Sequence, residues 1–105
     1  MQYIQVITTT ERKEEAERMA EELVERRLAG CVQIVGPITS IYRWKGEVVK
    51  AQEWLLFIKT GDSLYERVEK TVKELHPYET PEIIATEITA GSREYLEWLE
   101  REVEG

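Results

Sequence analysis

Hydrophobic and polar residues follow two different periods along this chain, and each change of period marks an expected element. A half-alternating, β-branched run at residues 3–9 predicts a strand. Residues 11–28 repeat apolar positions at the three- and four-residue spacing of a helix with one buried face. Gly30 ends that helix, and residues 31–35 form a short apolar run, which predicts a second strand.

A long hairpin is expected next. Residues 39–44 and 47–60 read as extended segments around Lys45-Gly46, which suits a tight turn. At ~3.3 Å per residue the second segment could reach about 46 Å, roughly twice what a small four-stranded sheet needs. Its tip, with Trp44, would project beyond its own core, and projecting strand edges pair with neighbours. We therefore favour an intersubunit role, the alternative being a bent strand that stays on its own domain.

The remaining elements complete a β-α-β-β-α-β order. A capping box at residues 63–66 opens a second helix, which ends before Pro77. Residues 82–88 predict a strand, and a short amphipathic helix follows Ser92. This order predicts an α+β fold, the ferredoxin-like split β-α-β sandwich, with an extra C-terminal helix. By length, residues 1–105 form one domain.

Charge and cysteine content narrow the partners. The net charge of −7 argues against nucleic acid, whose phosphates call for a basic surface. The longest apolar run, residues 54–58, is too short to cross a membrane, and no signal peptide is recognised at the start. Cys31 is the single cysteine, so no intrachain disulfide can form, and we expect a cytoplasmic protein.

The carboxylates are almost all glutamate, and the chain has no asparagine. Charged residues make up 33% of the chain, compared with about 25% in ordinary domains. Enrichment in glutamate and lysine with few thermolabile amides is typical of heat-adapted proteins. We therefore expect a thermostable protein of thermophilic origin.

The segment around the only histidine carries the most chemistry. His76 and Thr80 each precede a proline, which disfavours helical backbone and stiffens the loop. A stiff loop that presents imidazole, phenol and carboxylate groups is suited to binding. The structural alternative is a helix-terminal histidine that interacts with the end of its own helix, followed by solvated Glu79 and Glu82.

Other kinds of site are poorly supported. A structural zinc site needs four Cys or His ligands, and the chain holds two such residues. No CxxC pair and no glycine-rich phosphate loop occurs. Cys31 lies in an apolar run and is expected to be a buried, inert thiol. A catalytic Cys31–His76 pair would need the two residues to be adjacent in space.

Five segments, in order and with matching spacing, resemble the CutA family of divalent-cation tolerance proteins. They are residues 25–32 (ERRLAGCV), 39–46 (TSIYRWKG), 59–60 (KT), 76–83 (HPYETPEI) and 95–99 (YLEWL). The resemblance implies a ferredoxin-like homotrimer built through the long hairpin, similar to the PII signalling proteins. It also implies a cytoplasmic role in tolerance of copper and other divalent metals, with no established catalytic activity. Leu75 precedes His76 here, whereas members with proposed copper binding carry additional thiols or a second adjacent histidine.

We therefore predict a trimeric, non-enzymatic protein that binds a divalent metal, copper or a similar ion, at a subunit-interface cleft. His76 and Glu79 are the expected metal ligands, and Lys59, Tyr78 and Trp44 the expected lining of the cleft. Two alternatives stay open. One is a PII-like module that binds a small anionic metabolite through Lys59, and the other is a hyperstable scaffold without a ligand.

Overall fold

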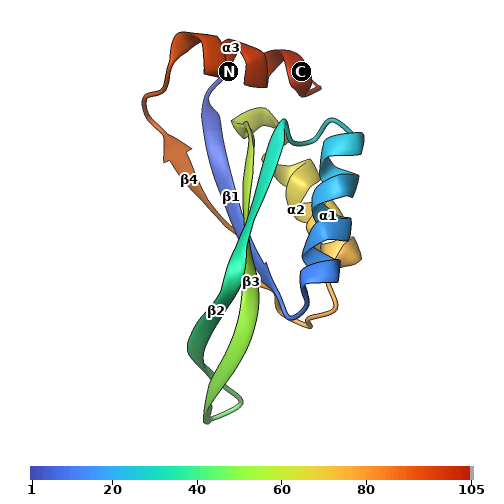
Figure 1. Cartoon of the computed structure of the whole chain (residues 1–105), viewed down its shortest axis with the longest axis vertical. Coiled ribbons are helices and arrows are strands. Elements are labelled where there is room, and N and C mark those ends of the chain that lie inside the picture. Colours follow the sequence, from blue (N-terminus) through green and yellow to red (C-terminus); the bar gives the residue numbers. More distant parts are fainter. Residues whose placement is uncertain (105) are drawn as a thin grey trace.

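The computed structural model describes residues 1–104 and shows a four-stranded antiparallel sheet with helices α1 and α2 on one face (Figure 1). The strand order is β2-β3-β1-β4, which is the ferredoxin-like arrangement expected from the sequence. The elements are β1 (Tyr3–Thr10), α1 (Lys13–Glu25), β2 (Cys31–Trp44), β3 (Glu47–Gly61), a 3-10 turn (Asp62–Leu64), α2 (Tyr65–Leu75), β4 (Ile84–Ile88) and α3 (Arg93–Glu102).

The core lies between the sheet and helices α1 and α2. Even-numbered residues of β1 and β3 point toward the helices, since Val6 pairs with Ile58 and both are fully buried. The helices contribute the positions that their spacing predicts, such as Met19 and Leu23 on α1 and Val68 on α2. The binary pattern of the chain therefore specifies which face of each element is buried. Among residues 1–104, no helix is long and apolar enough to span a membrane.

Several boundaries differ from the sequence prediction. The capping box expected at residues 63–66 is wrong, because a 3-10 turn precedes α2 and its N-cap is Leu64, which makes no side-chain cap hydrogen bond. Strand β4 begins at Ile84 rather than at residue 82. Helix α1 ends at Glu25 rather than near Leu28, because Arg27 adopts a left-handed φ of 59°, which breaks the helix. The two expected segments at residues 31–35 and 39–44 are one strand, β2, with a register shift between Val35 and Ile38. A Cβ on Gly36 would lie 2.5 Å from the Trp54 ring, so the glycine admits the indole at this bulge.

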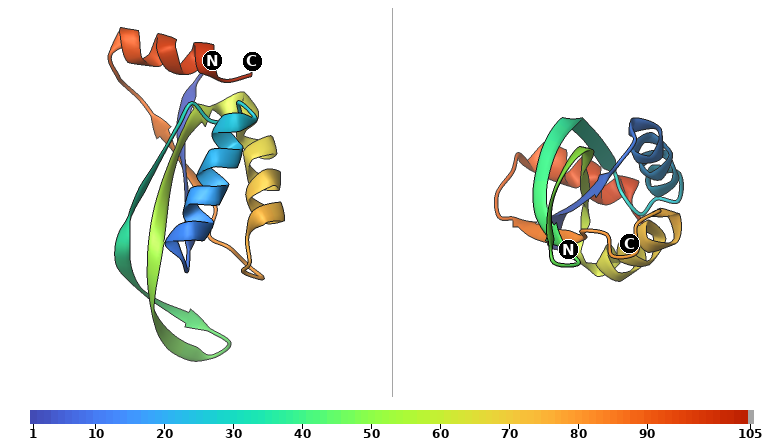
Figure 2. Two further views of the ribbon diagram at one scale, coloured as in Figure 1. Left: turned by 45° about the vertical axis from the view of Figure 1, so that its right-hand side comes forward. Right: turned by 90° about the horizontal axis from the view of Figure 1, so that it is seen from below.

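The β2–β3 hairpin projects far beyond the rest of the sheet. Within β3, only residues 54–61 pair with β1. Residues 38–44 of β2 and 47–53 of β3 therefore pair only with each other. We call this part of the hairpin the arm. It extends past the ends of the helices, with its tip bent back toward the helix side of the sheet, and gives the subunit its longest dimension of 44 Å (Figure 2). The projection expected from strand length is confirmed, whereas its pairing with a neighbour stays a prediction.

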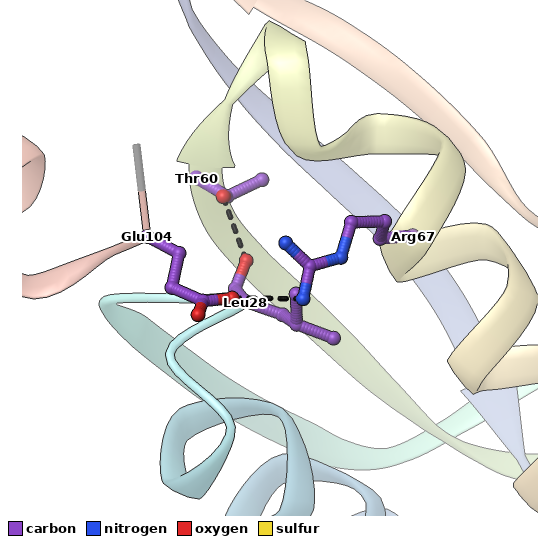
Figure 3. A network of polar contacts seen from close by, with 4 residues as sticks. All are labelled: Leu28, Thr60, Arg67 and Glu104. Atoms are coloured by element: carbon purple, nitrogen blue, oxygen red, sulfur yellow. Dashed lines mark hydrogen bonds and ion pairs between the residues drawn. The ribbon is translucent and has the colours of Figure 1, made fainter.

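Helix α3 closes the end of the sheet opposite the arm (Figure 1). Leu99 on α3 is fully buried, and a Cβ on Gly30 would lie 2.5 Å from its Cδ1, so the helix approaches the chain closely at this glycine. Figure 3 shows the ion pair that holds the C-terminal segment, in which Arg67 Nη2 lies 2.8 Å from Glu104 Oε2. The same view shows the 2.7 Å hydrogen bond that Thr60 Oγ1 on β3 donates to the Leu28 carbonyl. The burial of Leu99 shows that the additional helix docks on its own domain.

Candidate ligand site at the base of the arm

His76 follows α2 and is buried, with 9% of its surface exposed. Its backbone is extended (φ −87°, ψ 132°), as expected for a residue before proline. Nε2 lies 2.6 Å from the Thr9 carbonyl oxygen, and Nδ1 accepts a hydrogen bond of 3.1 Å from the Tyr78 backbone N–H. Because a carbonyl can only accept, the ring proton sits on Nε2, and the imidazole is held as one neutral tautomer.

Burial lowers the pKa of His76, and the Thr9 carbonyl together with the nearby Glu15 and Glu53 carboxylates opposes this only in part. The imidazole is therefore neutral at physiological pH. A neutral imidazole is the form that binds metal ions.

Tyr78 connects this histidine to the arm. Its ring centroid lies 4.7 Å from that of His76, and its hydroxyl donates a 2.8 Å hydrogen bond to Glu53 Oε2. Burial, reinforced by the Glu53 carboxylate, raises the pKa of Tyr78, so the phenol keeps its proton and remains a donor. Glu53 is only 5% exposed and lies on β3 directly before Trp54, where pairing with β1 begins.

Glu53 is a residue of the candidate site that the sequence analysis does not identify. It had a detectable signal, because it is a carboxylate that immediately precedes the longest apolar run of the chain. A carboxylate that is buried in a strand needs hydrogen-bond donors, and Tyr78 supplies one. The Thr9 carbonyl carried no such signal, since any residue type provides a backbone oxygen.

The other predicted site residues lie elsewhere in the subunit. Glu79 is exposed and follows Tyr78 directly. Lys59 is on the other half of β3, about 20 Å along the strand from Glu53, where its ammonium donates to Gln33 Oε1. Trp44 is at the tip of the arm and 39% exposed. One subunit therefore groups His76, Tyr78 and Glu79 in one loop, but does not bring Lys59 or Trp44 to them.

Metal-ligating groups are sparse within one subunit. Across the described residues 1–104, no group of three or more His, Cys, Asp or Glu side chains is placed to hold a metal ion. Cys31 is half-buried rather than fully buried, and it pairs with Lys59 at the α3 end of the sheet, away from His76. The subunit thus does not form a Cys31–His76 pair. His76 and Glu79 are ligands of the right kind for Cu²⁺ or Zn²⁺, but they are too few for a complete site.

The sheet face opposite α1 and α2 is rich in apolar side chains. Odd-numbered residues of β1 and β3 and even-numbered residues of β4 point to this face. Val35 is 47% exposed and Ile84 is 51% exposed. The apolar residues of this open face are Tyr3, Ile7, Val35, Leu55, Phe57, Ile84 and Ile88. Exposed apolar surface of this extent is typical of an interaction surface.

The fold and the arm define a class of protein: a ferredoxin-like α+β domain with an elongated hairpin and an open sheet face. Residues 4–102 match the family described as CutA1 divalent ion tolerance protein. The chain belongs to this CutA1 family.

Individual relatives agree over nearly the whole chain. The divalent-cation tolerance protein CutA of Thermus thermophilus is 52% identical over 94 residues, which cover 90% of this chain and 91% of the relative. A solved structure of the Thermus thermophilus protein has a TM-score of 0.95 with 48% identity, covering 97% and 99% of the two chains. CutA1 from Oryza sativa has a TM-score of 0.96 with 40% identity, covering 99% and 95%.

The cellular location of relatives varies. The Arabidopsis thaliana relative, 45% identical over 91% of this chain and 53% of its own length, is described as chloroplastic. The Archaeoglobus fulgidus structure, with a TM-score of 0.94 and 38% identity over 97% of this chain and 99% of its own, is described as periplasmic. The cytoplasmic location expected for this chain therefore stays a prediction.

Proposed function

We propose that this chain forms a homotrimer and binds a divalent metal ion, copper or a similar ion, at a cleft between subunits, without catalysing a reaction. The observation that carries the proposal is the position of the only imidazole, at the base of a projecting arm, in a subunit that supplies too few ligands alone. His76 and Glu79 would bind the ion. Lys59, Tyr78 and Trp44 would line the cleft, with Lys59 and Trp44 contributed by neighbouring subunits.

Assembly is supported by the arm and by the open face. The arm has two unpaired strand edges, and its exposed side chains include Ile41 and Val48, each 67% exposed. A neighbour that adds a strand to the arm would satisfy these edges. Pairing of the arm with a different surface of the next subunit is head-to-tail, and such contacts close into a ring when three successive rotations return to the first subunit.

Sedimentation equilibrium tests the assembly. We expect three times the monomer mass of 12.3 kDa at micromolar concentration. Trp44→Glu should shift the equilibrium toward monomer, because it places an unpaired charge in the proposed interface. Glu79→Gln, which alters an exposed loop carboxylate, should stay trimeric. A wild-type monomer at this concentration contradicts the proposal.

Isothermal titration with Cu²⁺ and Zn²⁺ tests the metal site. We expect modest affinity, at most one ion per subunit, with binding that weakens below about pH 6 as the imidazole protonates. His76→Gln keeps a donor and an acceptor for the local hydrogen bonds but should abolish binding, and Glu79→Gln should weaken it. Glu82→Gln, an exposed carboxylate nearby, is the matched control and should bind as wild type does. Equal affinity in wild type and His76→Gln eliminates the site.

Isothermal titration with a panel of nucleotides, beside the metal titration, separates the alternatives. A PII-like module would bind a member of a nucleotide panel and lose it in Lys59→Gln, with no dependence on His76. A scaffold without a ligand would bind neither metal nor nucleotide in any variant.

A further inference from the structure

A chain of hydrogen bonds joins three segments that are distant in sequence. It runs from the Thr9 carbonyl at the end of β1 to the His76 ring, from the ring to the Tyr78 backbone, and from the Tyr78 hydroxyl to Glu53 at the base of the arm. The expected ligand site and the arm are therefore connected through one residue, Tyr78.

Both ring nitrogens of His76 are already engaged. The lone pair of Nδ1 receives the Tyr78 N–H, and Nε2 carries the proton that is donated to Thr9. A metal ion needs a lone pair, so one of these hydrogen bonds must open before the imidazole can bind it. The Nδ1 bond is the longer, at 3.1 Å compared with 2.6 Å, and Thr9 is buried and fixed in the ladder of β1. The Tyr78 amide is therefore the group that must move.

Tyr78 cannot withdraw its amide alone. Pro77 restrains the backbone that precedes it, and its phenol is held at 2.8 Å by the Glu53 carboxylate. Hydrogen bonds to a charged acceptor are the stronger kind. Movement of the Tyr78 amide away from Nδ1 strains or breaks the contact with Glu53, and hence loosens the attachment of the loop to the arm.

We propose that the Tyr78–Glu53 hydrogen bond is a latch that couples access to His76 to the anchoring of the arm. The proposal rests on the metal-binding function proposed above and adds its regulation. Metal binding opens the latch and frees the base of the arm, and a well-anchored arm lowers the affinity for metal. By thermodynamic reciprocity the two effects are equal in size.

The test measures Cu²⁺ and Zn²⁺ affinity in wild type, His76→Gln and Tyr78→Phe. Tyr78→Phe removes the phenol hydroxyl but keeps the ring and the backbone amide, so the cost of opening falls. We expect it to bind about tenfold more tightly than wild type, the factor that corresponds to the loss of one hydrogen bond of about 1.4 kcal/mol. Tyr65→Phe is the matched control, because the Glu69 carboxylate contributes, after burial, to the raised pKa of Tyr65, but Tyr65 lies on α2 away from the arm. It should keep wild-type affinity.

Amide hydrogen exchange of the arm gives a second readout that does not depend on affinity. Exchange of residues 38–53 should be faster in metal-free Tyr78→Phe than in metal-free wild type, and saturating Zn²⁺ should raise it in wild type but not in His76→Gln. Binding that depends on His76 but is unchanged in Tyr78→Phe, with unchanged arm exchange, overturns the latch alone. Equal metal affinity in wild type and His76→Gln overturns the proposed site, and the latch with it.

Discussion

Replacement of His76 by alanine should destabilise the fold as well as remove a ligand. The sequence alone indicates a residue at a helix end, but the structure shows His76 buried and bonded to two backbone groups. Two hydrogen bonds contribute about 0.5–1.5 kcal/mol each, and a buried partner left without one costs about 1–3 kcal/mol. Thr9 is buried and carries that penalty, whereas the half-buried Tyr78 amide can reach water. We expect a loss of about 2–4 kcal/mol in the free energy of unfolding.

The measurement is guanidinium denaturation at pH 7.5 with a chelator present, so that no metal contributes. Protein concentrations must be matched, because the stability of an oligomer depends on concentration. His76→Gln is the control, since an amide can still donate to the Thr9 carbonyl and accept from the Tyr78 amide, and it should recover most of the loss. A His76→Ala variant within about 0.5 kcal/mol of wild type would behave like a surface substitution and refute the reasoning.

Three further outcomes are expected. Because burial lowers the pKa of His76 in the folded protein, the unfolded state takes up its proton first as the pH falls. The free energy of unfolding should therefore decrease as pH drops below about 6.5. A pH series of denaturation midpoints with the same decrease in His76→Gln would contradict this. Leu99→Ala should cost about 2–5 kcal/mol, because Leu99 is fully buried beneath α3, and a calorimetric melt that is unchanged would count against that docking. The glutamate-rich composition predicts a thermal midpoint above about 90 °C, and a midpoint of 50–60 °C would reject thermostability.

Much of the fold was predictable because its signals are local. The period of apolar residues identified the strands and helices, and their order implied the antiparallel sheet that the structure shows. The errors occur where a local signal has two meanings. The apolar run stops at Val35, which predicts the end of a strand, but β2 continues through a bulge at Gly36 that accommodates Trp54. The spacing of α1 continues to Leu28, and only the left-handed backbone of Arg27 shows where the helix stops.

The candidate site was less predictable because backbone atoms define it. The sequence identified the loop that holds His76 and Tyr78, and the structure places the two ring centroids 4.7 Å apart. It could not show that the imidazole would be bonded to a carbonyl 67 residues away. A backbone oxygen has no residue-type signature, and its position depends on the packing of α2 against the sheet. Glu53 could have been suspected from its apolar surroundings, but its partner could not.

The burial of the single imidazole bears on how a tolerance protein would use it. An exposed histidine binds metal with its full intrinsic affinity, whereas a ligand that becomes available only after a contact opens has an affinity reduced by the fraction of open molecules. If the Tyr78 contact must open before metal can bind, His76 would bind little metal at low metal concentration and more when metal is in excess. A protein that stores or delivers scarce metal needs the opposite behaviour. The link through Tyr78 and Glu53 would then convert excess metal into a change at the arm, the surface through which the subunits are proposed to meet.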